Sequence, residues 1–214
     1  MKILLFLFLG GSLGSFLGLV IDRFPHHSII APASHCNHCK IHLKAWDLIP
    51  ILSQLSTKSK CRYCQAKIPY WYLLLEMTTA LLVTLTAYQI LSVTTCLVLL
   101  TGLVLGIYDI KHREYPIMVW MSFTFLTLLF SSLNWLFLLF LVLALLAEKY
   151  DLKIGSGDLF YLATLSLILP YNSLLWLVHI SSILGILTYF YLYRSKLPFV
   201  PFLWIASILV LVIF

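Results

Sequence analysis

The stretch Gly155-Ser156-Gly157-Asp158 stands where a polar loop gives way to an apolar run over residues 159–169. A carboxylate at the mouth of a hydrophobic helix is costly unless it has a function or a partner. Asp109 occupies a matching place, because it ends an apolar run just before a basic loop. We therefore expect Asp109 and Asp158, distant in the chain, to face each other and to share one task.

The composition is that of a membrane protein. Of the 214 residues, 62% are hydrophobic and only 10% are charged, and the mean hydropathy is +1.00. Soluble domains carry about 25% charged residues, so no water-soluble core would hide this much apolar surface. The net charge of +6 comes from basic residues scattered over loops. This scatter indicates topology signals rather than a nucleic-acid site.

Apolar runs predict an all-α polytopic membrane protein of about eight transmembrane helices. Residues 1–21 form the first helix, which we expect to be retained rather than cleaved as a signal peptide, with a glycine stripe suited to close helix packing. The later runs cover residues 70–88, 90–108, 116–130, 135–147, 159–169, 173–193 and 199–214. Residues 116–147 allow one long tilted helix or two short ones, and the charge distribution favours two.

With eight spans, the loops alternate between the two sides of the bilayer, and every Lys and Arg except Lys2 falls on one side. These residues are Arg23, Lys40, Lys44, Lys58, Lys60, Arg62, Lys67, Lys111, Arg113, Lys149, Lys153, Arg194 and Lys196. The positive-inside rule then predicts that both aspartates and the polar insert at residues 22–69 face the cytoplasm.

The insert carries two C-x2-C hooks, Cys36 with Cys39 and Cys61 with Cys64. Four thiolates complete a closed tetrahedral zinc shell, so we expect a structural Zn²⁺ that staples a segment too small for a strong core. Disulfides or redox chemistry are the alternatives, and a reducing cytosol disfavours both. The expected domains are residues 1–21, the zinc-binding insert 22–69, and a membrane core 70–214.

Two carboxylates can hydrolyse a peptide bond without a metal or a covalent nucleophile. One takes a proton from water while the other polarises the scissile carbonyl and later protonates the amine. Gly155 and Gly157 would allow tight turns and close backbone approach beside Asp158. Each aspartate taken alone could instead be a helix cap or a loop residue.

Together these features resemble the type IV prepilin leader peptidases, bacterial membrane aspartyl proteases of the GxGD type that include those serving competence pili. The resemblance covers nearly the whole chain. It rests on the segments GSFL at residues 14–17, VIDRFP at 20–25, WDLIPILS at 46–53 and YWYLLLE at 70–76, and on the two aspartates. Phe160 stands where the family usually has a Lys, and Gly18 where it has an Asn.

The resemblance implies that Asp109 and Asp158 are catalytic and that the enzyme lies in the bacterial cytoplasmic (inner) membrane. The implied partners are prepilin or pseudopilin precursors and the lipid bilayer. It also implies a possible N-methyltransferase activity that uses S-adenosylmethionine in the zinc-bearing region. Glu76 and Asp47 are then candidate cofactor-binding residues, although Glu76 could be an interhelical contact and Asp47 could be a cap.

Two other classes of function fit parts of this pattern. A non-catalytic membrane scaffold would recruit a partner through the zinc insert and use the aspartates as caps. A transporter would use the aspartates as a proton relay, but both carboxylates lie at one interface rather than near the middle of the membrane.

Overall fold

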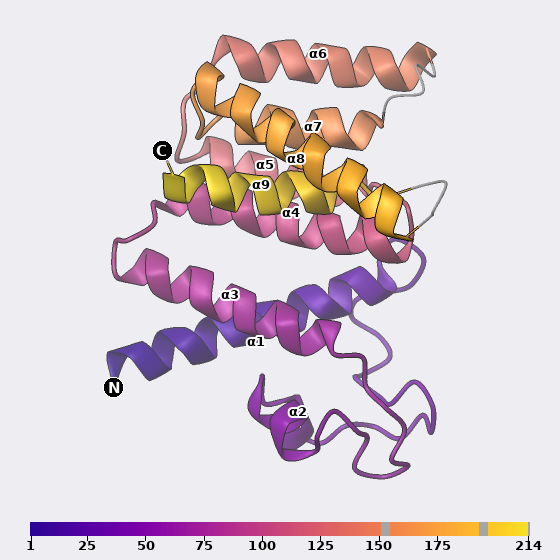
Figure 1. Cartoon of the computed structure of the whole chain (residues 1–214). Helices are drawn as coiled ribbons and strands as arrows, with labels where there is room; N and C mark the ends of the chain where they lie inside the picture. Colours follow the sequence, from indigo (N-terminus) through magenta and orange to yellow (C-terminus); the bar gives the residue numbers. More distant parts are fainter. Residues whose placement is uncertain (151–154, 193–196, 214) are drawn as a thin grey trace. The chain divides into compact units, whose positions relative to one another are not determined.

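The computed structural model describes residues 1–150, 155–192 and 197–213. Over these ranges regular structure is helical, and extended pairing is limited to two isolated bridges, His35 with His42 and Lys60 with Lys67. The prediction of an all-α chain is therefore confirmed. Internal contacts divide the chain into two compact units, Met1–Ser92 and Val93–Phe214, which are described separately (Figure 1).

The first unit is built on a pair of helices that carries the polar insert. Its elements are α1 (Lys2–Arg23), the 3-10 helix η1 (Ala45–Leu48), α2 (Leu52–Ser56) and α3 (Trp71–Ala87). Helices α1 and α3 pack against each other along much of their length (Figure 1). The insert leaves the end of α1 and returns to the start of α3, with α2 alongside the helix pair rather than beyond its ends.

Glycines explain how closely α1 approaches α3. A Cβ atom built on Gly10 would lie 2.7 Å from the Cα of Ala80. One on Gly14 would overlap Thr79 Oγ1 and would lie 2.8 Å from the Cα of Glu76. The small-residue face expected from the sequence therefore packs directly on backbone, where dispersion contacts are closest.

The second unit is a group of six helices over the residues that the structure describes. They are α4 (Val93–Lys111), α5 (Ile117–Leu128), α6 (Trp135–Tyr150), α7 (Ser156–Leu165), α8 (Tyr171–Leu192) and α9 (Val200–Ile213). Helix α4 contacts α5, α7 and α9, while α9 also contacts α7 and α8, and α6 packs on α7 (Figure 1). Residues 116–147 form two helices, α5 and α6, as the charge distribution favoured.

Polar side chains connect these helices where lipid would leave them unsatisfied. Asn134 accepts the backbone N–H of Phe137 at 2.8 Å, capping α6, and its amide donates to the carbonyl of Ser166 at the end of α7, at 2.6 Å. Trp120 Nε1 of α5 donates to Thr164 Oγ1 of α7 at 2.8 Å. These bonds fix α7 between its neighbours.

Three of the described helices are long and apolar enough to cross a bilayer by themselves: α1, α4, and residues Tyr171–Tyr191 of α8. Helices α3, α5 and α9 are apolar but shorter. The chain is therefore a helical membrane protein, and the count of about eight spans stays a prediction. Among the basic residues used for that count, Lys153, Arg194 and Lys196 lie outside the described residues.

Substituting Gly14 with Ala is expected to destabilise the first unit by about 1–3 kcal/mol, because the added methyl group would overlap Thr79 and Glu76. The matched control is Gly185→Ala in α8, where the nearest atom would be 3.6 Å from the new Cβ. Thermal unfolding in detergent measures both variants. Equal melting temperatures for the two would contradict the close α1–α3 contact.

Candidate functional site

Three helix ends of the second unit meet where the two aspartates lie. Asp109 is near the C-terminal end of α4, and Asp158 is in the first turn of α7. The N-terminus of α9 is the third end, and α4, α7 and α9 contact one another. All three ends point to the right-hand side of this helix group in Figure 1. The arrangement brings together segments far apart in the sequence.

Asp109 is half-buried and faces the start of α9. The backbone N–H of Val200 donates to Asp109 Oδ2 at 3.2 Å, and the amide of Phe199 also faces this carboxylate. The first amides of a helix have no partner within the helix and carry partial positive charge, so they stabilise a carboxylate. Arg113, beyond the end of α4, adds a favourable electrostatic interaction with Asp109.

Asp158 is half-buried, and its carboxylate occupies space that Gly155 leaves open, while Gly157 leaves space for a neighbouring ring. A Cβ on Gly155 would lie 2.6 Å from Asp158 Oδ2, and one on Gly157 would overlap the ring of Tyr115. Neither glycine adopts a positive φ. The close approach expected from the sequence is present, but the tight turns that only glycine can make are not used.

Asp158 lies near enough to Asp109 for an electrostatic interaction between the two carboxylates. Like charges at short range do not both ionise cheaply, so two neighbouring carboxylates favour a state in which one of them carries a proton. That state supplies a base and an acid at one place, which is the requirement for activating water against a carbonyl.

Sequence reasoning missed the aromatic wall beside Asp158. The Tyr115 ring stacks on Phe160 with centroids 5.9 Å apart, and Phe160 packs against Trp120 at 4.6 Å. The Tyr115 hydroxyl is buried and has no hydrogen-bond partner within the described part of the chain. The only sequence signal for a role of Tyr115 was its position, directly before Pro116 and a few residues after Asp109. This wall keeps the surroundings of Asp158 apolar.

The four hook cysteines of the first unit converge. The Sγ atoms of Cys36, Cys39, Cys61 and Cys64 all lie within 4.8 Å of one another, and none of them forms a disulfide. Cys36 Sγ and Cys64 Sγ are 3.8 Å apart. A tetrahedral zinc site with bonds of about 2.3 Å separates its sulfurs by roughly 3.8 Å, so the cluster fits such an ion.

The two hooks share one backbone design. In each, the amide of the first cysteine donates to a carbonyl five residues later: Cys36 to Ile41, and Cys61 to Ala66. The residue four positions after each first cysteine has a positive φ, 57° at Lys40 and 58° at Gln65. The matched turns present both pairs of thiols to the same point.

The pKa values of the Cys36 and Cys64 thiols are shifted in opposite directions. The backbone amide of Cys39 lowers the pKa of the Cys36 thiol to about 6, which favours its thiolate. The amide of Ala66 lowers the pKa of Cys64, but burial and the three neighbouring thiols outweigh it and raise that pKa to about 11. Four thiolates at this distance repel one another, and a divalent ion removes the conflict.

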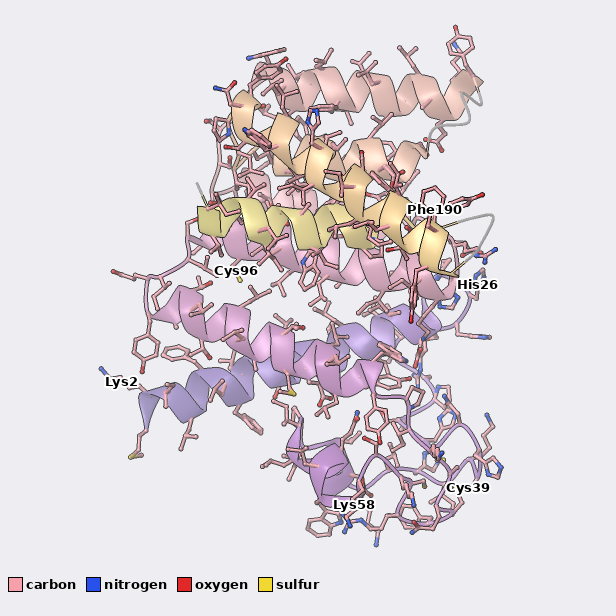
Figure 2. The ribbon with its side chains drawn as sticks, viewed as in Figure 1. Lys2, His26, Cys39, Lys58, Cys96 and Phe190 are labelled. Carbon is pink, nitrogen blue, oxygen red and sulfur yellow. The ribbon has the colours of Figure 1, made fainter. Side chains whose placement is uncertain are left out.

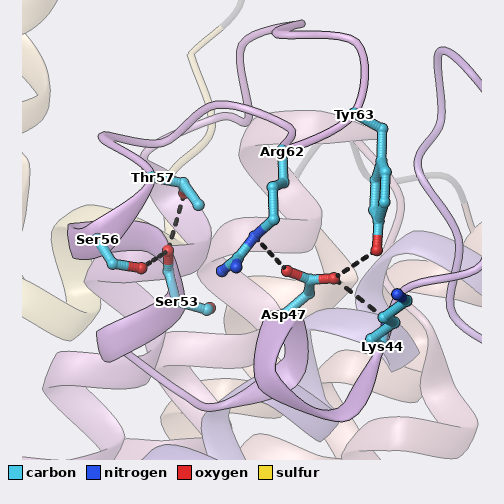
Figure 3. A network of polar contacts seen from close by, with 7 residues as sticks. All are labelled: Lys44, Asp47, Ser53, Ser56, Thr57, Arg62 and Tyr63. Carbon is cyan, nitrogen blue, oxygen red and sulfur yellow. Dashed lines mark hydrogen bonds and ion pairs between the residues drawn. The ribbon is translucent and has the colours of Figure 1, made fainter.

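Asp47 and Glu76 both line a cavity of about 740 Å³ in the first unit, together with Ser15, Asp22 and Arg23. Asp47 accepts from the Lys44 amide at 3.2 Å and pairs with Arg62 Nε at 3.1 Å, so it does cap η1. Tyr63 donates to the same carboxylate (Figure 3). Glu76, buried in α3, accepts the amide of Ile51 at 2.7 Å.

Comparison with known proteins identifies relatives of this chain. Residues 8–90 match the family model described as the bacterial peptidase A24 N-terminal domain. The prepilin leader peptidase/N-methyltransferase of Bacillus subtilis is 32% identical over 96% of this chain and 92% of its own length. The protein of the same name from Neisseria gonorrhoeae is 29% identical over 79% of this chain and 66% of its own.

A third relative, from Escherichia coli, is named a type 4 prepilin-like proteins leader peptide-processing enzyme. It is 41% identical over 32% of this chain, and the match spans 33% of that relative's own length. No solved structure matches the chain. The Bacillus subtilis match runs through both compact units, and so the chain belongs to the prepilin leader peptidase/N-methyltransferase family.

Proposed function

We propose that this protein is an aspartic endopeptidase that removes the basic leader from type IV prepilins or pilin-like precursors. The observation that carries the proposal is the meeting of Asp109 and Asp158 at adjoining ends of α4 and α7, near enough to interact. The family relationship supplies the class of substrate.

In the proposed mechanism one carboxylate is ionised and takes a proton from a water molecule, which attacks the scissile carbonyl. The other carboxylate is protonated; it polarises that carbonyl and then gives its proton to the departing amine. The amides at the start of α9 and Arg113 stabilise negative charge on Asp109. The aromatic side chains of Tyr115 and Phe160 lie on one side of Asp158.

The proposed location is the bacterial inner membrane, with both aspartates and the insert at the cytoplasmic face. The basic residues that the structure describes support this orientation, because Lys111, Arg113 and Lys149 follow or end helices on the side of the carboxylates. A short basic leader would then remain in the cytosol while its hydrophobic helix lies in the bilayer.

Replacing Asp109 or Asp158 with Asn is expected to lower leader removal by about 10²–10⁴-fold, since an amide neither accepts the proton of water nor donates an acidic one. In Asp109→Asn the side-chain amide would still offer an oxygen to the N–H of Val200, so the cap of α9 persists. Processing of a co-expressed prepilin, followed by immunoblot, measures the effect.

Glu148→Gln is the matched control, because Glu148 is an exposed carboxylate at the end of α6. We expect it to process the substrate normally. If both Asp variants also process the prepilin at the wild-type rate, the aspartates are caps and the chain acts as a scaffold that recruits its partner through the insert.

We also propose that the four cysteines hold one structural Zn²⁺, because a shell of four thiolates leaves no open position for catalysis. The ion would join the first hook to the second across the insert. The insert then has the rigidity that its few buried apolar residues do not supply.

Purified protein is expected to contain about one zinc per chain, as the number of thiolates requires. Cys61→Ser, which removes a buried ligand, should lose most of that metal and make residues 36–67 sensitive to protease. Cys96→Ser, within α4, should keep the metal and serves as the control. Elemental analysis of the purified proteins measures their zinc content, and a stable zinc-free protein would contradict the assignment.

For methyl transfer, we propose that the cavity of the first unit binds S-adenosylmethionine. Its volume of about 740 Å³ suits a ligand of this size. The Asp22 and Glu76 carboxylates offer negative charge to the sulfonium and amino groups, and Arg23 offers a partner for the ligand carboxylate. Residues 22–69, with the adjoining ends of α1 and α3, would thus form the methyltransferase region.

Glu76→Gln is expected to reduce N-methylation of the mature pilin while leaving leader removal intact. The amide keeps an acceptor for Ile51 but removes the negative charge that faces the cavity. Mass spectrometry of the pilin amino terminus measures its methylation, and an immunoblot measures leader removal. Full methylation by this variant would exclude Glu76 from the proposed cofactor site.

A further inference from the structure

The stretch between the two hooks, residues 45–57, contacts the helix pair of the first unit through its turn at residues 49–51. It consists of η1, a turn at residues 49–51, and α2. A Cβ on Gly11 of α1 would lie 3.1 Å from Pro50 Cβ and 3.7 Å from Ile51 Cδ1. The Ile51 amide is held by Glu76 of α3.

These contacts lie far along both helices. At a rise of about 1.5 Å per residue, Gly11 is about 18 Å from Arg23, the charged end of α1. Glu76 is about 8 Å from Trp71, the first residue of α3, on the same basis. The turn at residues 49–51 therefore contacts both helices within their apolar length rather than at the ends that lead into the insert.

Three large apolar side chains of this stretch are exposed: Trp46 is 61% exposed, Leu52 63% and Leu55 56%. Lys44 precedes these side chains and Lys58 follows them (Lys58 is labelled in Figure 2). An apolar segment with a cation at each end matches a bilayer, in which the apolar groups enter the hydrocarbon and the ammonium groups remain among the headgroups.

Several polar groups of the stretch have partners within the protein. Ser56 and Thr57 both donate to the carbonyl of Ser53, at 3.0 and 2.8 Å (Figure 3). The Asp47 carboxylate is paired with Arg62. Irregular backbone is tolerated at membrane depth only where its polar groups have such partners, and the bond from Ile51 to the buried Glu76 supplies one.

We propose that residues 45–57 form a re-entrant loop that enters the bilayer from the end of α1 marked by Arg23 and returns to the same side. Its partner is lipid hydrocarbon. Helix α3 exposes Leu74, Met77 and Leu81 on one face, so lipid already contacts this unit at the depth the turn reaches. The loop also contributes Leu48 and Gln54 to the wall of the 740 Å³ cavity, which places that cavity at the membrane surface.

Depth-resolved fluorescence of the full chain in liposomes tests this proposal. A Cys96→Ser background, with the four hook cysteines held by zinc, receives a single new cysteine labelled with an environment-sensitive fluorophore. For Leu52→Cys and Leu55→Cys we expect blue-shifted emission and several-fold stronger quenching by brominated lipids than for Ala33→Cys, an exposed insert position outside the loop.

Leu81→Cys, on the exposed face of α3, is the lipid-facing reference and should resemble the Leu52 and Leu55 labels. If those two labels behave like Ala33→Cys, with water-like emission and no lipid quenching, the loop is not in the bilayer. If they are shielded from water but not quenched by brominated lipid, a protein surface covers them, and this result also overturns the proposal.

Discussion

Helices surrounded by lipid gain nothing from hiding apolar surface, so this structure depends on places where backbones come close and polar groups pair. Gly10 and Gly14 bring α1 onto the backbone of α3. In the second unit, Gly102 leaves room for Tyr161 and Trp204, while Gly157 leaves room for Tyr115. Each glycine matters for the side chain it lacks, because no described glycine has a positive φ.

The same principle explains the two polar centres. The insert has too few buried apolar residues to be stabilised by a hydrophobic core. Instead, its two matched hooks hold the four thiols within 4.8 Å of one another. The half-buried Asp109 carboxylate is only partly solvated by water. Backbone N–H groups at the start of α9 donate to it instead. In both places a charged or ionisable group is supported by backbone N–H donors, which cannot rotate away as a side chain can.

Local sequence patterns predicted much of the helical fold and the cysteine cluster. Cysteine spacing indicated the cysteine cluster, and apolar runs placed the helices. The assignment of Asp109 and Asp158 to one side of the bilayer from Lys and Arg stays a prediction. The contacts between distant segments were beyond sequence reasoning. Nothing near Asp109 indicates that Val200 donates to it, and nothing near Glu76 indicates that it holds Ile51. The roles of Tyr115 and of the turn at Pro50 likewise depend on tertiary packing.

The bond between Val200 and Asp109 joins positions 91 residues apart, one in the last helix described and the other in the first helix of the second unit. During synthesis, α4 enters the membrane long before α9 leaves the ribosome. Asp109 therefore receives this backbone donor only after α9 has docked, so the order of synthesis separates the carboxylate from the amide that stabilises it.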